Sequence, residues 1–202
     1  MPGTRFGMAM AQRLDIEMDL ADDGAFPALG EGARERTGLI PATKGAQVSK
    51  IDAMGEADAP AFDPDMAQDM RLQAANPLAA RPVHRTQGIS LAGSMQPCLW
   101  TIDGQIWGTH EPVVAVSGER APLMFHNMSM MGHPMHLCGH AFQVVNIHRK
   151  PVNGAMRDTV HVPPMGRVTD ARDVGKAARW MLHCHRMPQL STGMMTECAV
   201  SA

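Results

Sequence analysis

The feature that most constrains this chain is a cysteine held between two histidines, His183-Cys184-His185, with Gly193 and Met194 a short way downstream. Thiolate, imidazole and thioether together form a ligand set that suits copper. Successive side chains of an extended strand point to opposite faces, so Cys184 would point one way and the two histidines the other. One strand could then serve a thiolate site on one face and an imidazole site on the other. Such an arrangement suits the movement of an electron between two metal centres.

A second cluster of metal-binding residues lies earlier in the chain. Three histidines and a cysteine occur between His133 and His140. His136, Cys138 and His140 have the same parity in the sequence, so they would share one face if the segment is extended. Imidazole and thiolate are again ligands that bind copper. The two clusters together predict that copper is the cofactor of this chain.

The two clusters resemble the C-terminal pair of copper motifs in multicopper oxidases. Those motifs read HPxHLHGH and HCHxxxHxxxGM, and here they stand as HPMHLCGH and HCHRMPQLSTGM. The neighbouring FHNMSMMGHPMH, GHAFQVV and RDTVHVPPMG resemble the bacterial copper-resistance and laccase-like branch of that family. The resemblance is clear over residues 100–200 and weaker over residues 5–47.

The resemblance implies one site of the kind called type 1 in this family. His133 would be its first histidine, Cys184 its thiolate and Met194 its weak axial ligand. Gln189 stands where the family has the second histidine. Gln is known at blue copper sites in the axial place and is a poor replacement for an equatorial imidazole. Whether Gln189 binds copper therefore stays open.

The resemblance also implies part of a trinuclear copper cluster. His136 would serve the type 2 copper, and His183 and His185 would serve the type 3 pair. Cys138 stands where the family has a histidine of the cluster. A thiolate is a soft ligand, so Cys138 could still bind Cu(I). Its alternative role is that of a small apolar side chain.

The function that the resemblance implies is that of a copper-binding oxidoreductase module. Electrons from a small reducing substrate, a phenol, an aromatic amine or Cu(I), would pass through the type 1 copper to the cluster, which reduces dioxygen to water. The family takes half of the cluster's histidines from an N-terminal domain with HWHG-like and HSH-like motifs, and neither motif occurs here. The chain alone is therefore expected not to reduce oxygen, and a partner chain could supply the missing histidines.

Two alternatives to an oxidase stay open. The chain could be a copper-binding or electron-transfer domain without oxidase activity, or a truncated and degenerate remnant. Both fit the two altered ligand positions, Cys138 and Gln189. The chain is thus an enzyme only by its family resemblance.

Composition excludes several other classes of function. The 202 residues carry a net charge of -2 with mixed signs, which indicates neither nucleic acid nor an anionic membrane as a partner. No apolar run is long enough to span a bilayer, and residues 1–12 lack the features of a signal peptide. The family resemblance implies the periplasm. Four cysteines without a CxxC pair indicate no disulfide framework.

The pattern along the chain predicts an all-β protein. Residues 1–48, with a half-buried strand over 13–20, resemble the end of a preceding cupredoxin domain, and residues 49–96 are expected to be a mostly irregular linker with a short helix within 64–75. Residues 97–202 carry short strands separated by turns, typical of a β-sandwich, which the resemblance identifies as a cupredoxin-like (plastocyanin-like) Greek-key domain. Strands are expected over 112–116, 123–127, 141–147, 159–162, 180–185 and 194–200.

Three charged residues of this domain need an explanation. Asp170 and Arg172 have the parity of Val168, on a face that should be apolar. Because buried charge is costly unless it is paired, the two could pair with each other at i, i+2. The simpler alternative is that the chain has drifted under weak selection. Asp158 could hydrogen-bond a ligand histidine or could be an ordinary charge at a strand end.

Overall fold

The chain divides into two compact units, which are described separately. The computed structural model describes residues 1–20, 22–32, 34–55 and 63–202. One unit comprises Leu14–Ala61, and the other comprises Met1–Arg13 together with Phe62–Ala202. Among the described residues no helix is long and apolar enough to cross a membrane.

The smaller unit contains one hairpin. Strands β1 (Ala28–Gly32) and β2 (Glu35–Leu39) pair in antiparallel fashion, and their side chains are mostly exposed. The strand expected over residues 13–20 does not form, and that prediction was wrong. Alternation produces a strand only where a sheet covers the apolar face. Here Ile16 stays 55% exposed, and Met18 and Leu20 are also exposed.

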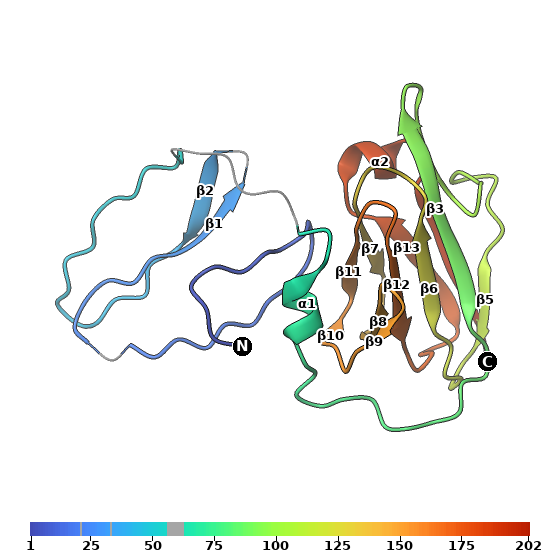
Figure 1. Ribbon diagram of the computed structural model, residues 1–202, viewed down its shortest axis with the longest axis horizontal. Helices are drawn as coiled ribbons and strands as arrows, with labels where there is room; N and C mark the ends of the chain where they lie inside the picture. The colour runs from blue at the N-terminus through green and yellow to red at the C-terminus, as the bar shows by residue number, and fades with distance from the viewer. Residues whose placement is uncertain (21, 33, 56–62) are drawn as a thin grey trace. The chain divides into compact units, whose positions relative to one another are not determined.

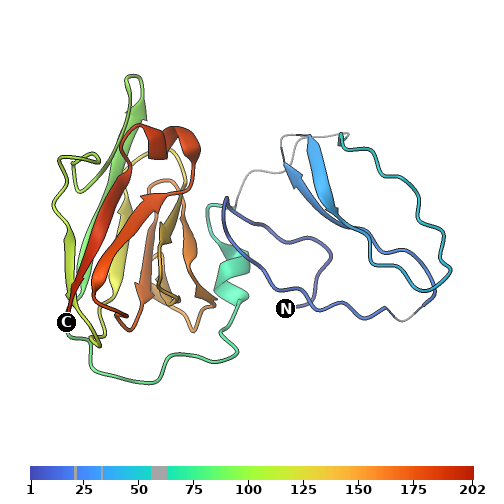
Figure 2. The same ribbon diagram turned by 180° about the vertical axis from the view of Figure 1, so that it is seen from behind.

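The larger unit is a sandwich of two sheets, as Figures 1 and 2 show from opposite sides. The strand order is β10-β8-β12-β6-β3-β4, with β9 beside β8, in one sheet and β11-β7-β13-β14-β5 in the other. The strands of the first sheet are β3 (Gln87–Met95), β4 (Cys98–Ile102), β6 (Leu123–Asn127), β8 (Phe142–Ile147), β9 (Lys150–Pro151), β10 (Met156–Arg157) and β12 (Arg167–Ala171). Those of the second are β5 (Val113–Val116), β7 (His133–Leu137), β11 (Thr159–Val162), β13 (Ala178–Cys184) and β14 (Met195–Ser201).

The core lies between the two sheets and contains the alternate residues of their strands. Leu91 and Phe125 face it from the first sheet, and Leu137 and Leu182 face it from the second. Burial of one such side chain stabilises the fold by about 1.5–3 kcal/mol. The strands expected over 112–116, 123–127, 141–147, 159–162, 180–185 and 194–200 are confirmed with shifts of one or two residues at most.

The sandwich begins inside the stretch that was expected to be a linker. Residues 87–95 were predicted to be loop, but they form β3, which pairs with β4 and runs parallel to β6. The strand was missed because Gly88, Ser90 and Gly93 are not typical of strands. Ile89 and Leu91 between them are nevertheless buried. The short helix expected within 64–75 is confirmed as α1 (Ala67–Arg71).

Two opposite charges are buried inside the sandwich. Arg172 Nη1 lies 3.6 Å from Asp170 Oδ1, and both side chains are fully buried. The backbone N–H of Leu123 donates to the same carboxylate oxygen at 2.9 Å. The i, i+2 pairing, one of the two interpretations of these charges, is therefore present in the structure. Asp170 lies near the end of β12 and Arg172 directly after it, both among apolar neighbours.

Candidate metal centre

Strand β13 separates the metal-binding residues onto two faces. Its register with β7 sets His183 opposite His136, and Cys184 opposite Met135. Cys184 is fully buried in the sandwich, while His183 is half-buried on the other face together with His185. The alternation of an extended strand thus gives one thiol inside and two imidazoles outside.

The inner face gathers a thiol, an imidazole and an amide. The Cys184 Sγ–H group donates to Gln189 Oε1 at 3.0 Å, and His133 Nδ1 lies 2.8 Å from that same oxygen. Cys184 Sγ and His133 Nδ1 are 3.9 Å apart. On the far side of the ring, Ser129 Oγ lies 2.8 Å from His133 Nε2, and the N–H of Arg186 donates to the sulfur at 3.4 Å.

This hydrogen-bond pattern fixes the protonation of the inner site. An amide oxygen only accepts, so His133 carries its proton on Nδ1 and accepts from the Ser129 hydroxyl at Nε2. Burial lowers the pKa of His133 to about 4 and raises the pKa of Cys184 to about 11. Imidazole and thiol are therefore both neutral at pH 7. A metal ion that binds here has to displace the thiol proton of Cys184, and the proton of the neutral His133 ring has to move from Nδ1 to Nε2.

Two of the inner residues fit a copper ion and one does not. Bonds of about 2.3 Å to a thiolate and about 2.0 Å to an imidazole hold the two ligand atoms roughly 3.5–4 Å apart. The 3.9 Å between Cys184 Sγ and His133 Nδ1 agrees with that separation. Gln189 Oε1 lies instead at hydrogen-bond distance from both, and the Gln189 Nε2 group is buried without a partner among the described residues. Gln189 joins Cys184 and His133 by hydrogen bonds rather than completing a ligand set.

Gln189 and Met194 reach the inner site from a segment whose structure the sequence did not predict. Gln189 lies on α2 (Met187–Ser191), a short helix at one end of the sandwich that was not predicted (Figure 1). Gly193 follows with a φ of 116°, which glycine adopts without strain. The turn brings Met194 beside Cys184, whose N–H donates to the Met194 carbonyl at 3.1 Å, and the Met194 side chain is fully buried.

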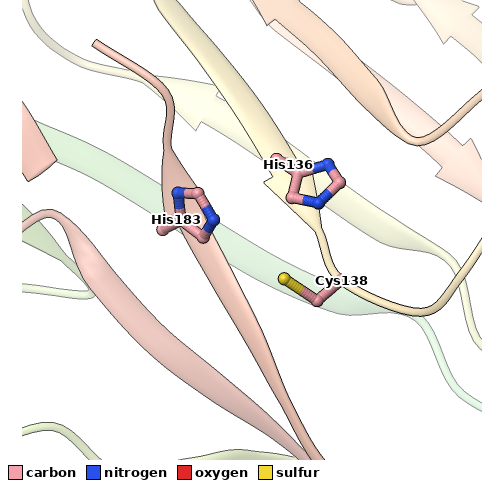
Figure 3. Close-up of side chains that lie close together, drawn as sticks. All are labelled: His136, Cys138 and His183. Atoms are coloured by element: carbon pink, nitrogen blue, oxygen red, sulfur yellow. The ribbon is translucent and has the colours of Figure 1, made fainter. Parts of the chain in front are cut away.

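The outer face gathers three imidazoles and a second thiol. The ring of His136 lies 5.4 Å from that of His183 and 5.6 Å from that of His185, measured between centroids, and the latter two rings are 5.1 Å apart. Cys138 joins them, since ligand atoms of His136, Cys138 and His183 all lie within 4.8 Å of one another. Figure 3 shows the Cys138 sulfur directed toward the space between the two rings.

Backbone carbonyls orient two of the outer histidines. His136 Nδ1 lies 2.9 Å from the carbonyl oxygen of Asp158, and His183 Nδ1 lies 3.1 Å from that of Cys184. A carbonyl only accepts, so both rings carry the proton on Nδ1 and keep the Nε2 lone pair for a metal. The Asp158 carboxylate pairs with Arg13 at 2.6 Å. Asp158 therefore orients His136 directly through its backbone carbonyl. Its carboxylate acts on the ring indirectly, through the Thr159 hydroxyl, which donates to Asp158 Oδ1 at 3.2 Å and lies 3.0 Å from His136 Nδ1.

His140 does not lie on the outer face with His136 and Cys138. Strand β7 ends at Leu137, and Gly139 turns the chain with a φ of 68°. His140 Nδ1 lies 3.0 Å from the Cys138 carbonyl, and its Nε2 accepts from the N–H of Gly175 at 3.1 Å. Both ring nitrogens are thus used within the protein. The parity argument fails here because the segment is not extended beyond Leu137.

A methyl group at Gly139 is expected to disturb this turn. The Cβ of an alanine at position 139 would lie 2.2 Å from the Trp180 ring. The alanine would also have to adopt the left-handed backbone conformation that Gly139 has. We expect Gly139→Ala to lower the free energy of unfolding by about 2 kcal/mol or more, the sum of overpacking and backbone strain. Gly118→Ala is the control, since its φ of 83° is similar but its Cβ would meet nothing within 4 Å. Equal losses in denaturant titrations of both variants would show that the Trp180 contact is unimportant.

Sequence reasoning missed two buried neighbours of the inner site. Ser129 holds the far nitrogen of His133, and the preceding loop gave no pattern that marks it. His161 is buried beneath Gly132, where a Cβ would lie 2.5 Å from its ring, and its isolated position in the sequence gave no sign of this. Burial lowers the pKa of His161 to about 4, so it stays neutral.

Known proteins resemble this chain in sequence. A family model described as multicopper oxidase matches residues 80–202. Multicopper oxidase MmcO of Mycobacterium tuberculosis is 33% identical over 200 residues, which cover 94% of this chain and 37% of that protein. Copper resistance protein A of Escherichia coli is 30% identical over 57% of this chain and 19% of its own length. The chain thus spans little more than a third, or less, of the curated relatives it matches.

Solved structures agree on the fold. The multicopper oxidase McoA of Aquifex aeolicus superposes with a TM-score of 0.55 at 27% identity, covering 63% of this chain and 31% of McoA. A laccase from Pediococcus acidilactici gives a TM-score of 0.57 at 17% identity, covering 86% of this chain and 37% of the laccase. The second likeness concerns the fold alone. The predicted all-β, cupredoxin-like sandwich is confirmed.

Proposed function

Since the chain belongs to the multicopper oxidase family, we propose that it is a copper-binding oxidoreductase module with a type 1 site at Cys184. The observation that carries the proposal is the division of β13 into two faces, with the thiol 3.9 Å from His133 Nδ1 inside and His183 and His185 outside. A chain that binds a metal only for stability has no need of ligands on both faces of one strand.

The inner residues would each have a defined role. Cys184 and His133 would hold copper, and Met194 would be a further, weak ligand, as in the family motif that these positions match. Copper bound there supplies a one-electron redox couple. Ser129 fixes the His133 ring from behind, and the surrounding core keeps water from the sulfur. Gln189 would turn its amide away when the Cys184 thiol loses its proton and the His133 proton moves from Nδ1 to Nε2.

The outer residues would connect the inner site to oxygen chemistry. His183 directly precedes Cys184 in the chain, so a single peptide unit joins the two residues. The Nδ1–H of His183 also donates to the Cys184 carbonyl. His136, His183 and His185 would offer imidazoles to a cluster that further histidines from a partner chain complete. The electron donor would be a small reducing substrate or Cu(I), and dioxygen would be the acceptor. We place the protein in the periplasm on the family resemblance alone.

The test of the inner site is an anaerobic copper titration followed by visible and EPR spectra. We expect copper to give an intense thiolate charge-transfer band in the wild-type chain that is absent from Cys184→Ser. Cys138→Ser is the matched control, because it removes a thiol from the opposite face and should keep the band. A colourless wild-type titration, or a band that survives in Cys184→Ser, would refute the assignment of Cys184.

A further inference from the structure

The outer face carries a ligand set that is complete without any partner. We propose that His136, Cys138 and His183 form a mononuclear Cu(I) site in this chain. The site goes beyond the proposed function, because it uses no residue of the inner site and needs no histidine from elsewhere. Cys138, which stands where the family motif has histidine, is what makes it a site of its own.

Adjacent strands hold the three ligands in place. His183 on β13 lies directly opposite His136 on β7 in the antiparallel register. Cys138 follows β7 immediately, and its N–H donates to the Met181 carbonyl of β13 at 2.9 Å. The backbone of all three residues is therefore fixed by the sheet. A preformed arrangement of this kind loses little conformational entropy when a metal binds.

The ring orientations point to a metal independently of the proximity of the three residues. Both Nδ1–H groups are directed to backbone carbonyls, of Asp158 for His136 and of Cys184 for His183. Such contacts fix the tautomer of a histidine that binds metal through its other nitrogen. The two Nε2 lone pairs and the Cys138 sulfur are then the three donors that these residues offer to a metal. One ligand atom of each residue lies within 4.8 Å of a ligand atom of the other two.

The donor types favour Cu(I). Thiolates bind both Cu(I) and zinc. A zinc site needs a fourth ligand, which a water molecule would have to supply here, whereas three donors are enough to hold Cu(I). One thiolate and one Cu(I) ion also give a neutral site, and a half-buried face tolerates a neutral site better than a net positive one. The three ligands are each half-buried, so an ion from solution can reach them. The cluster proposed above uses His136 and His183 too, so the Cu(I) site belongs to the chain when no partner completes that cluster.

The experiment is an anaerobic Cu(I) titration against a colorimetric Cu(I) chelator in the Cys184→Ser background, which removes the inner thiol. We expect one Cu(I) per chain, with one sulfur and two nitrogen ligands in X-ray absorption. Adding Cys138→Ser should weaken binding by about tenfold or more, since even residues that only orient a ligand change metal affinity by about 10- to 100-fold. Cys98→Ser is the control, because Cys98 is exposed and is not one of the three ligands.

A second variant at position 138 distinguishes the loss of the sulfur ligand from a failure of Cys138→Ser to fold. Cys138→His restores an imidazole at this position and should bind Cu(I) through nitrogen alone, so the sulfur signal disappears. Three results would each overturn the proposal. The first is that the Cys184→Ser chain binds no Cu(I), and the second is that Cys138→Ser leaves the Cu(I) affinity unchanged. The third is that Zn(II) binds the site as tightly as Cu(I) and displaces it. None of these results bears on the charge-transfer band of the wild-type inner site. The failure of one proposal is thereby distinguishable from the failure of the other.

Discussion

Gln189→His is expected to raise the affinity of the inner site for copper by about 10- to 100-fold, the range over which supporting residues alone alter metal sites. The thiolate charge-transfer band should strengthen with it. The variant supplies a nitrogen ligand at the position where the family motif has histidine. It also removes the amide oxygen that accepts from both Cys184 Sγ–H and His133 Nδ1–H.

A control separates these two effects of the substitution. Gln189→Ala releases Cys184 and His133 from the amide oxygen but offers no new ligand. We expect copper binding by Gln189→Ala to stay within a few-fold of wild type, so that the gain depends on the imidazole. The measurement is a copper titration monitored at the charge-transfer band under anaerobic conditions. Equal gains in both variants, or none in Gln189→His, would show that position 189 does not face the metal.

The sequence predicted the two faces of β13 better than the edges of the fold. The parity of Cys184 against His183 fixes their opposite faces, because a strand permits nothing else. The strand over residues 13–20 failed although its alternation is regular, because Ile16 has no sheet to cover it. Strand β3 was missed for the opposite reason, since Gly88 and Ser90 hide the alternation while the parallel pairing with β6 holds the segment extended.

The inner and outer sites depend on contacts that no local pattern encodes. Gln189 reaches Cys184 only because α2 folds back over the end of the sandwich, and the sequence there indicated no helix. Ser129 meets His133 through a loop whose path depends on its neighbours. The role of the Asp158 carbonyl likewise follows from the pairing of β11 with β7, where Thr159 lies opposite His136.

The buried pair of Asp170 and Arg172 predicts a stabilising substitution. The double variant Asp170→Asn, Arg172→Leu is expected to be about 1–4 kcal/mol more stable than the wild-type chain at pH 7, because apolar or neutral replacements avoid the desolvation of two charges. The pair is poorly compensated, since Arg172 Nε and Nη1 and Asp170 Oδ2 have no hydrogen-bond partner among the described residues. In Asp170→Asn the amide oxygen would still accept from the N–H of Leu123, as the carboxylate oxygen does now.

The gain should require both changes. Arg172→Leu alone leaves a buried carboxyl group without its cation, and breaking a buried pair typically costs about 3–5 kcal/mol. The carboxyl can take up a proton, which limits that cost, whereas a guanidinium cannot lose one. We therefore expect the single variant to be less stable than wild type at pH 7. A single variant as stable as the double variant would show that Arg172 alone is the unfavourable group.

The advantage of the double variant should also depend on pH. Burial raises the pKa of Asp170 to about 6, above its ordinary value of 3.8. The stability that the protonated carboxyl provides is fully present below about pH 4 and is lost as the pH rises through about 6. The double variant lacks this titration, so its lead over wild type should be largest near pH 7 and shrink toward pH 4. Chemical denaturation at both pH values measures the difference, in which the groups common to both proteins cancel. A lead that does not change with pH would mean that Asp170 stays ionised in the core throughout this range, held by Arg172 alone.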